Sequence, residues 1–249
     1  MGVTAGIVVP HAPLLAHGGQ PELDVFRRST RDAFSTLKGC DVLVLVSPHG
    51  ERDAVYREVA GGLDRFGLDG IVVEAGSDAS LATELAGAWG RELSGGPADH
   101  GIVGTLAIAA AGTPIVACSL AEITGPHASG TVGDAIESAF LFADALVGVT
   151  GERRVGLIAC AHTAASLTPK APLALRPEGK ELDDLILDCL ATDCGSLARV
   201  EPDLWREAGA CGAGPLTALG VLFEGRRAQV LAYDHPFGVG YLVAAATHD

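Results

Sequence analysis

The fold is decided by the stretch VLVLVSPHG at residues 42–50, in which an unbroken apolar run is followed by Ser-Pro-His-Gly. Such a run is typical of a strand that is buried on both faces, as in the parallel sheets of α/β proteins. Because proline lacks a backbone N–H, we expect Pro48 to end the strand and His49 to leave the sheet at the strand's carboxyl end.

A second stretch, GIVVPHAP at residues 6–13, has the same design and places His11 directly after a short apolar run and a proline. In an open α/β sheet, the carboxyl ends of neighbouring parallel strands meet at one crevice, so the two imidazoles could share a metal ion. We therefore expect His11 and His49 to be ligands of one transition-metal ion. The plainer alternative is a pair of loop histidines whose ring nitrogens bond to backbone groups.

Outward from these two strands, apolar runs alternate with helical patterns along the chain. The other expected strands are residues 70–74, 114–118, 155–160, 228–232 and 240–245, and the expected helices are residues 21–38, 81–93, 104–111, 132–146, 179–190 and 215–223. We expect a hairpin within residues 53–69 and a surface loop over residues 163–178. The alternation predicts an α/β fold: a single three-layer domain over residues 1–249, with a mostly parallel or mixed sheet and helices on both faces.

The composition and charge of the chain indicate what its core contains and which binding partners and cellular locations are expected. The chain has 249 residues, 48% of them hydrophobic and only 5% aromatic, so its core must consist mainly of small aliphatic side chains. A formal net charge of -14 repels phosphate backbones, and we expect no nucleic-acid partner. The amino-terminal residues 1–15 lack a basic segment and their apolar run is interrupted by Pro10, so we expect neither a signal peptide nor a membrane span. The six cysteines form no CxxC pair, which favours free thiols and a cytoplasmic protein.

Two further histidines occupy positions suited to chemistry. His162 follows the apolar run at residues 155–160, so its side chain should face the same crevice as His11 and His49. There it could serve as a metal ligand or as an acid/base group. His100 follows Asp99 near the start of an expected helix, where the local positive potential favours a neutral imidazole that can accept a proton. The alternative for each is a histidine that bonds to a neighbouring backbone group.

A third ligand could come from the glycine-rich segment EAGACGAGP at residues 207–215. Pro215 suits the first turn of the helix that follows, so Cys211 lies near a helix amino terminus, where the dipole favours a thiolate. A thiolate is a metal ligand, and the carboxylate of Glu207 is the competing candidate. The plainer alternative is a buried cysteine in a tight loop.

Together, these motifs resemble the LigB-like superfamily, which comprises the catalytic subunits of class III extradiol ring-cleavage dioxygenases and the related Memo-like proteins. The resemblance extends over nearly the whole chain. It is carried by VPHAP at residues 9–13, SPHG at 47–50, DHG at 99–101, His162 after its strand, ACG at 210–212 with Pro215, and FGVGY at 237–241.

The resemblance implies a site and a reaction. In the dioxygenases of this superfamily, two histidines and a glutamate hold ferrous iron and leave positions open for a catecholate and dioxygen. By matching motifs, His11 and His49 would be ligands, His162 would be the acid/base residue that moves the catechol proton, and His100 would lie near the substrate. The expected ion is Fe(II), with zinc or copper as alternatives, and the expected substrates are a small aromatic and dioxygen.

The third ligand departs from the dioxygenase pattern. Where the ring-cleaving enzymes have glutamate, this chain has Cys211, as in the Memo-like branch, and we expect Cys211 rather than Glu207 to be the ligand. Two functions follow: an extradiol-type dioxygenase, or a Memo-like metal-binding, redox or protein-interaction module without ring cleavage. A reading without metal leaves the repeated strand-Pro-His arrangement unexplained. A second copy of the chain or a companion subunit could supply a lid.

Overall fold

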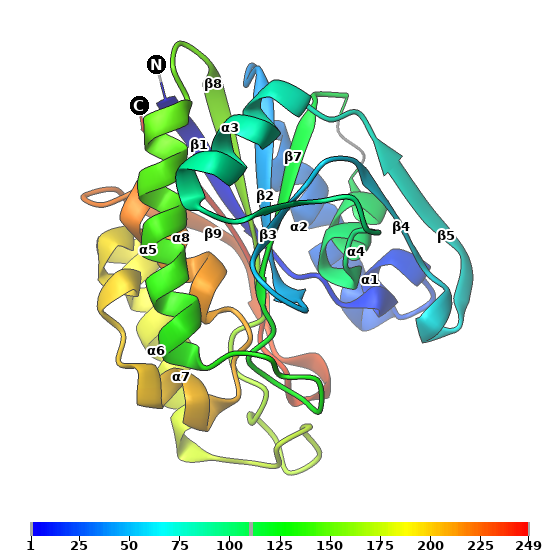
Figure 1. Ribbon diagram of the computed structural model, residues 1–249. Coiled ribbons are helices and arrows are strands. Elements are labelled where there is room, and N and C mark those ends of the chain that lie inside the picture. The colour runs from blue at the N-terminus through cyan, green and yellow to red at the C-terminus, as the bar shows by residue number, and fades with distance from the viewer. Residues whose placement is uncertain (1, 110–111, 249) are drawn as a thin grey trace.

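A mixed eight-stranded sheet forms the centre of the molecule in the computed structural model, which describes residues 2–109 and 112–248 (Figure 1). The four central strands β7, β2, β8 and β1 run parallel, and antiparallel pairings join the flanking strands to them. The order across the sheet is β6 (Glu92–Ser94), β3 (Ala54–Tyr56), β7 (Ile115–Ala121), β2 (Val42–Gly50), β8 (Arg154–Cys160), β1 (Gly2–Val9), β10 (Tyr241–Thr247) and β9 (Ala228–Asp234).

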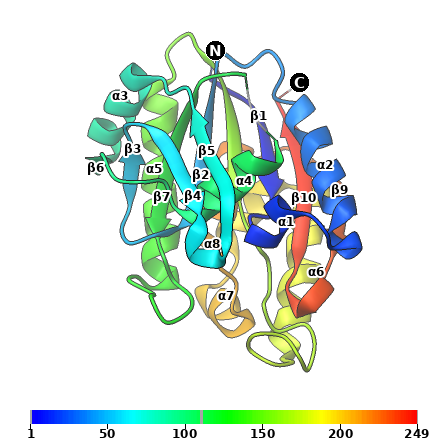
Figure 2. The ribbon, with the colours of Figure 1, turned by 90° about the vertical axis from the view of Figure 1, so that its right-hand side faces the viewer.

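Helices cover both faces of this sheet, as Figures 1 and 2 show. One face carries α3 (Ala79–Trp89), α5 (Val132–Val149), α6 (Pro177–Thr192), α7 (Pro202–Ala208) and α8 (Ala213–Leu222). The other face carries α1 (Pro13–His17), α2 (Asp24–Ser35), α4 (His100–Ile108) and a hairpin of β4 (Val59–Leu63) and β5 (Leu68–Ala75). Short 3-10 helices occur at Pro21–Leu23, Asp64–Phe66, Cys194–Arg199 and Pro236–Gly238. The predicted α/β fold with helices on both faces is confirmed.

Apolar side chains of β2 point alternately to the two faces of the sheet, which explains why the chain folds into three layers. Val44 and Val46 point into the hydrophobic core beneath α5 and α8, whereas Leu43 and Leu45 point into the core beneath α2 and α4. All four side chains are almost completely buried. A strand with apolar side chains on both faces must be covered twice, which is what the sequence of β2 predicts.

The end of β2 differs from the expectation that Pro48 stops the strand, because β2 continues through His49 to Gly50. Ser47 pairs with Ser119 of β7 and Gly50 pairs with Ala121, so three steps along β2 match two along β7. This irregular register accommodates a proline that cannot donate to the sheet. His49 therefore lies at a bulge at the strand's carboxyl end.

Other boundaries also need correction. The helix expected at residues 81–93 ends at Trp89, because Gly90 adopts the left-handed conformation at φ 66° and the chain then enters β6. The helix expected to begin at residue 104 begins at His100, and residues 110–111 lie outside the described part of the chain. The strand expected at residues 70–74 belongs to the β4–β5 hairpin and not to the main sheet. Helices α1 and α7 and the short strands β3 and β6 were not expected.

Within residues 2–109 and 112–248, no helix combines the length and apolar character that crossing a membrane requires. All six cysteines are free thiols, as expected. The carboxyl ends of β1, β2, β7 and β8 lie at one edge of the sheet, at the bottom of Figure 1.

Candidate metal centre

His11 and His49 meet at this edge. His11 follows β1 after Pro10 and is 2% exposed, and its Nε2 lies 2.7 Å from Nε2 of His49 at the end of β2. The expectation that the two strand-Pro-His motifs converge is confirmed. That the two imidazoles bind a metal stays a prediction.

Cys211 joins this pair from a distant part of the chain. It lies just before α8, whose first residue is Ala213, and its Sγ is 3.8 Å from Nε2 of His11. Two overlapping sets of possible metal donors result, and within each set the donor atoms lie within 4.8 Å of one another. The sets are His11, His162 and Cys211, and His11, His49 and His100.

His162 and His100 face the same cluster. His162 follows β8 and stacks on His11, with the ring centroids 4.3 Å apart, while Tyr241 packs against its ring at 4.7 Å. His100 is the first residue of α4, and its ring lies 4.1 Å from that of His49. The expectation that His162 opens toward the same crevice as His11 and His49 is thus confirmed, and His100 lies beside them; the catalytic roles of both residues stay predictions.

Burial and neighbouring groups set the protonation of three of these donors. Burial, assisted by His162, lowers the pKa of His11 to about 3. Burial and the neighbouring His49 lower the pKa of His100 to about 2. Burial alone would raise the pKa of the Cys211 thiol, but interactions with His11 and His162 outweigh it and hold that pKa well below its ordinary value. Neutral imidazole and thiolate are the forms that bind metal ions.

His49 differs from the other imidazoles. Burial alone would lower its pKa, but interactions with Cys211 and Glu122 raise the pKa of His49 to about 10. These interactions favour the protonated form of the His49 imidazole beside the Cys211 thiol. Metal binding requires His49 to release this proton.

The donor atoms fit a transition-metal ion. Nε2 of His162 is buried without a hydrogen-bond partner, which leaves this ring short of a bond that a ligand could supply. Two metal–nitrogen bonds of ~2.0–2.1 Å at a tetrahedral centre hold the nitrogens about 3.4 Å apart, so His11 and His49 need to separate by less than about 1 Å. Imidazole and thiolate suit zinc, copper and iron rather than magnesium or calcium.

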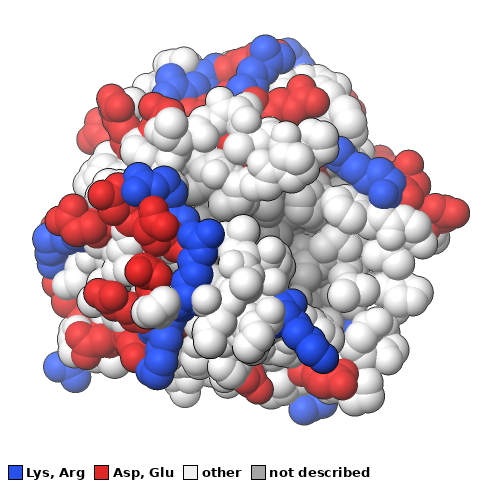
Figure 3. Space-filling view, turned by 90° about the horizontal axis from the view of Figure 1, so that it is seen from below, with Lys and Arg blue, Asp and Glu red and all other residues white. Residues whose placement is uncertain are grey.

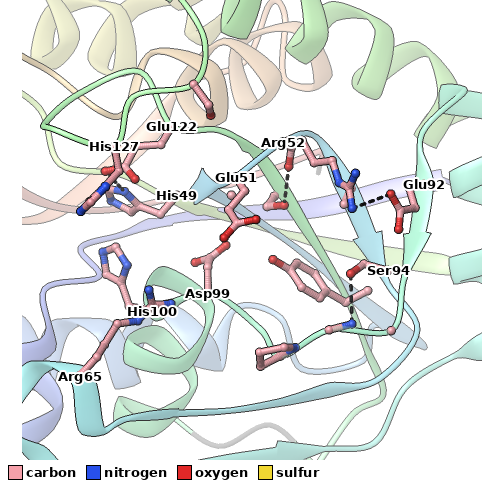
Figure 4. Close-up of a pocket in the computed structure, with 18 residues that line it drawn as sticks. His49, Glu51, Arg52, Arg65, Glu92, Ser94, Asp99, His100, Glu122 and His127 are labelled. Carbon is pink, nitrogen blue, oxygen red and sulfur yellow. Dashed lines mark hydrogen bonds and ion pairs between the residues drawn. The ribbon is translucent and has the colours of Figure 1, made fainter.

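The centre opens into two adjoining cavities. The smaller, about 250 Å³, contains the whole donor cluster. The larger, about 740 Å³, begins at His49 and His100 and has charged and polar walls that include Glu51, Arg65 and Asp99 (Figure 4). Seen from the edge where the strands end, the surface is hollowed near its middle, and mostly uncharged residues surround the hollow (Figure 3). The cluster is therefore accessible to a ligand.

Glu207 does not belong to this site. It lies near the end of α7, where its carboxylate pairs with Arg176 at 3.3 Å and with Arg206 at 3.1 Å on the surface. Neither donor set within the described residues includes Glu207 or any other carboxylate. The geometry thus supports Cys211 over Glu207 as the third donor.

Sequence reasoning missed Glu122. This residue directly follows β7, and its Oε1 lies 3.4 Å from Nδ1 of His49 (Figure 4). The expected strand ended at residue 118, three residues before the observed end at Ala121. The same rule that located His11 and His49, a polar residue at the carboxyl end of a parallel strand, would have found Glu122 with the correct boundary.

Comparisons with known proteins add a fold relationship. No family model and no curated protein matches the sequence. Among solved structures, the chain is similar to the uncharacterized protein JW3007 from Escherichia coli K12, with a TM-score of 0.63 and 16% sequence identity. The match covers 97% of this chain and 99% of that chain. At this identity the likeness shows a shared fold over almost the whole length and carries no information about activity.

Proposed function

We propose that this protein is a metal-dependent dioxygenase of the extradiol type, which cleaves a catecholic or related aromatic ring with dioxygen. The observation that carries the proposal is the 2.7 Å approach of the Nε2 atoms of His11 and His49 beside the thiol of Cys211. These three residues would hold the ion. Fe(II) is the ion that ring cleavage requires, and zinc and copper are the competing ions that a thiolate-containing site attracts.

The open cavity supports a catalytic role for the metal. Structural metal sites are closed by protein ligands, whereas catalytic sites keep positions for substrate. Here the donor cluster lines a cavity of about 250 Å³ that continues into one of about 740 Å³. The smaller cavity suits a single aromatic ring, and the larger one has room for polar substituents, so the substrate need not be as small as a bare catechol.

The ion, His162 and His100 would have different roles in this reaction. A bound ferrous ion would bring the two catechol oxygens and dioxygen together and allow electrons to pass between them. His162 lines the same cavity, and its buried Nε2 has no partner, so it can take a proton from a catechol hydroxyl and return it later. His100, whose low pKa keeps it neutral, can accept or donate a hydrogen bond to the substrate.

A second candidate function rests on the identity of the third donor. Iron dioxygenases with two histidines use a carboxylate, and the donor sets of the described residues contain Cys211 and no carboxylate. This favours a Memo-like metal-binding or redox module without ring cleavage. For either function we propose a cytoplasmic location, where the six free thiols would stay reduced.

Anaerobic reconstitution separates the two candidates. The metal-free protein is loaded with Fe(II), and in parallel with Zn²⁺ or Cu⁺, and the metal content of each sample is measured. Oxygen uptake is then followed with a panel of substituted catechols. We expect one ion per chain and, for the iron form, oxygen uptake that matches loss of catechol. Tight metal binding without uptake on any catechol favours the second candidate, and absence of metal binding overturns both.

A further inference from the structure

A carboxylate lies beside the candidate centre without belonging to it. Oε1 of Glu122 is 3.4 Å from Nδ1 of His49, and the two side chains are 23% and 10% exposed. Nδ1 of His49 is buried and makes no hydrogen bond within the described residues, so the carboxylate of Glu122 stands at ion-pair distance from a ring nitrogen that still lacks a partner. The other ring nitrogen of His49 faces His11. The imidazole is thus placed between the metal centre and one carboxylate.

The backbone holds Glu122 in this place. Its N–H donates to the carbonyl of Gly50, the residue after His49, at 2.8 Å. Its own carbonyl accepts from the N–H groups of Ser129 and Gly130 at 2.8 and 3.1 Å. The end of β7 is therefore fastened both to the end of β2 and to the loop that follows. These contacts fix the backbone from which the Glu122 side chain reaches His49.

We propose that Glu122 is a positioning residue for the metal centre, which accepts the Nδ1–H of His49 and so keeps the Nε2 lone pair of that ring directed at the ion. This inference rests on the proposed function, because it needs a metal at His11 and His49. Histidine ligands commonly donate their second ring N–H to a carboxylate, which fixes the tautomer and increases the basicity of the ligand.

The charge of Glu122 explains how this site can differ from a two-histidine, one-carboxylate centre. In that arrangement, the carboxylate binds the ion directly. Here the thiolate of Cys211 takes the ligand position and the negative charge of Glu122 acts through the imidazole of His49. A divalent ion is then balanced by two negative charges, one on a ligand and one behind a ligand.

The test compares Glu122→Ala and Glu122→Gln with the control Glu51→Ala. Glu51 lines the same larger cavity, and the structure shows no ion pair for it within the described residues. Zn²⁺ affinity is measured by competition with a chromophoric chelator under reducing conditions, and the Co²⁺ absorption spectrum reports the geometry of the ligands. The unfolding free energy of each metal-free variant shows whether the fold is intact.

We expect Glu122→Ala to weaken Zn²⁺ binding by about 10- to 100-fold, the usual effect of removing the partner of a histidine ligand. Glu122→Gln should lose less, because its amide oxygen still accepts from Nδ1–H. Glu51→Ala should bind as the wild type does, and the Co²⁺ band of the Cys211 thiolate should persist in every variant. Unchanged stability of the metal-free variants would exclude a merely structural role.

Two results would overturn the inference alone. Wild-type affinity in Glu122→Ala would show that the carboxylate does not support His49. Equal, severe losses in the Ala and Gln variants, with a changed Co²⁺ coordination spectrum, would make Glu122 a direct ligand. Failure of the wild-type protein to bind Zn²⁺ or Co²⁺ would instead refute the proposed metal centre itself.

Discussion

Ser47 Oγ donates a 2.6 Å hydrogen bond to Oδ1 of Asp99, and this contact joins the end of β2 to the start of α4. The same carboxylate oxygen accepts the backbone N–H groups of Gly101 and Ile102 and so caps α4. A Cβ atom on Gly101 would collide with Ser47 Oγ, so a larger residue at this position would displace the hydroxyl from Asp99. The buried carboxylate of Asp99 thereby fixes the end of the strand that carries His49 against the start of the helix that begins at His100.

Asp99→Ala should therefore destabilise the protein by about 2–4 kcal/mol, because it removes a helix cap and leaves the Ser47 hydroxyl and two backbone N–H groups without their acceptor. Thermal and urea unfolding of the metal-free protein would measure the loss. The matched control is Asp78→Ala, which removes the cap that Asp78 provides to Leu81 N in α3, on the opposite face of the sheet from α4. It should cost about 1 kcal/mol. Equal losses in both variants would contradict a special role for Asp99.

Cys211→Ser should weaken metal binding by more than the ~10- to 100-fold expected for loss of a ligand's hydrogen-bonding partner. The serine hydroxyl stays protonated where the thiol ionises, so it is a poor replacement for the thiolate. Glu207→Gln should bind metal as the wild type does, because Glu207 pairs with Arg176 and Arg206 on the surface. Metal affinity measured by chelator competition checks both variants. The reverse ranking would restore the carboxylate as ligand.

His162→Ala should keep its metal and lose activity. If His162 moves protons for a substrate bound at the ion, turnover should fall by ~10²-fold or more while metal content stays nearly unchanged. The exposed His17 at the end of α1 provides the control, and His17→Ala should match the wild type in both measurements. His162 belongs to one donor set with His11 and Cys211. A variant that loses the metal would therefore identify His162 as a ligand.

The part of the site that sequence reasoning located depends on local signals. His11, His49 and His162 each follow an apolar run whose end can be recognised within a few residues, and parallel strands bring such ends together. Cys211 was located by its glycine-rich loop and the helix after it. These signals require no knowledge of which strands are neighbours, which explains why the convergence of these residues could be expected.

The part that was missed depends on burial and on long-range pairing. The apolar run of β7 is interrupted by Ser119, which looks like a strand end but is 1% exposed and donates to the carbonyl of Arg52. The strand therefore continues to Ala121, and Glu122 was not considered. The three-residue strands β3 and β6 leave too short a pattern to recognise. They form because β3 pairs with β7 and β6 pairs with β3.

A second buried carboxylate holds the segment after His162. Asp183 in α6 is 1% exposed, accepts the N–H of Ala164 at 2.9 Å and accepts the hydroxyl of Tyr233 at 2.6 Å. Burial raises the pKa of Asp183, and the hydrogen bonds from the Tyr233 hydroxyl and the Ala164 N–H only partly oppose this. The segment that begins at His162 is thus anchored to a carboxyl group that binds its proton more tightly in the folded protein than in the unfolded chain.

The stability of the wild type relative to Asp183→Asn should therefore decrease as pH rises from about 4 toward neutrality. Below the unfolded pKa of about 3.9, both states hold the proton and the contribution is fully present. Between this value and the raised folded pKa, the unfolded chain releases a proton that the folded protein keeps, so unfolding becomes easier with rising pH. Asparagine does not titrate, and the other carboxylates cancel in the comparison.

Urea denaturation across this pH range measures the difference, with Asp184→Asn, an exposed neighbour paired with Lys180, as the control. Parallel curves for wild type and Asp183→Asn would show that the carboxyl group of Asp183 has an ordinary pKa in the folded protein.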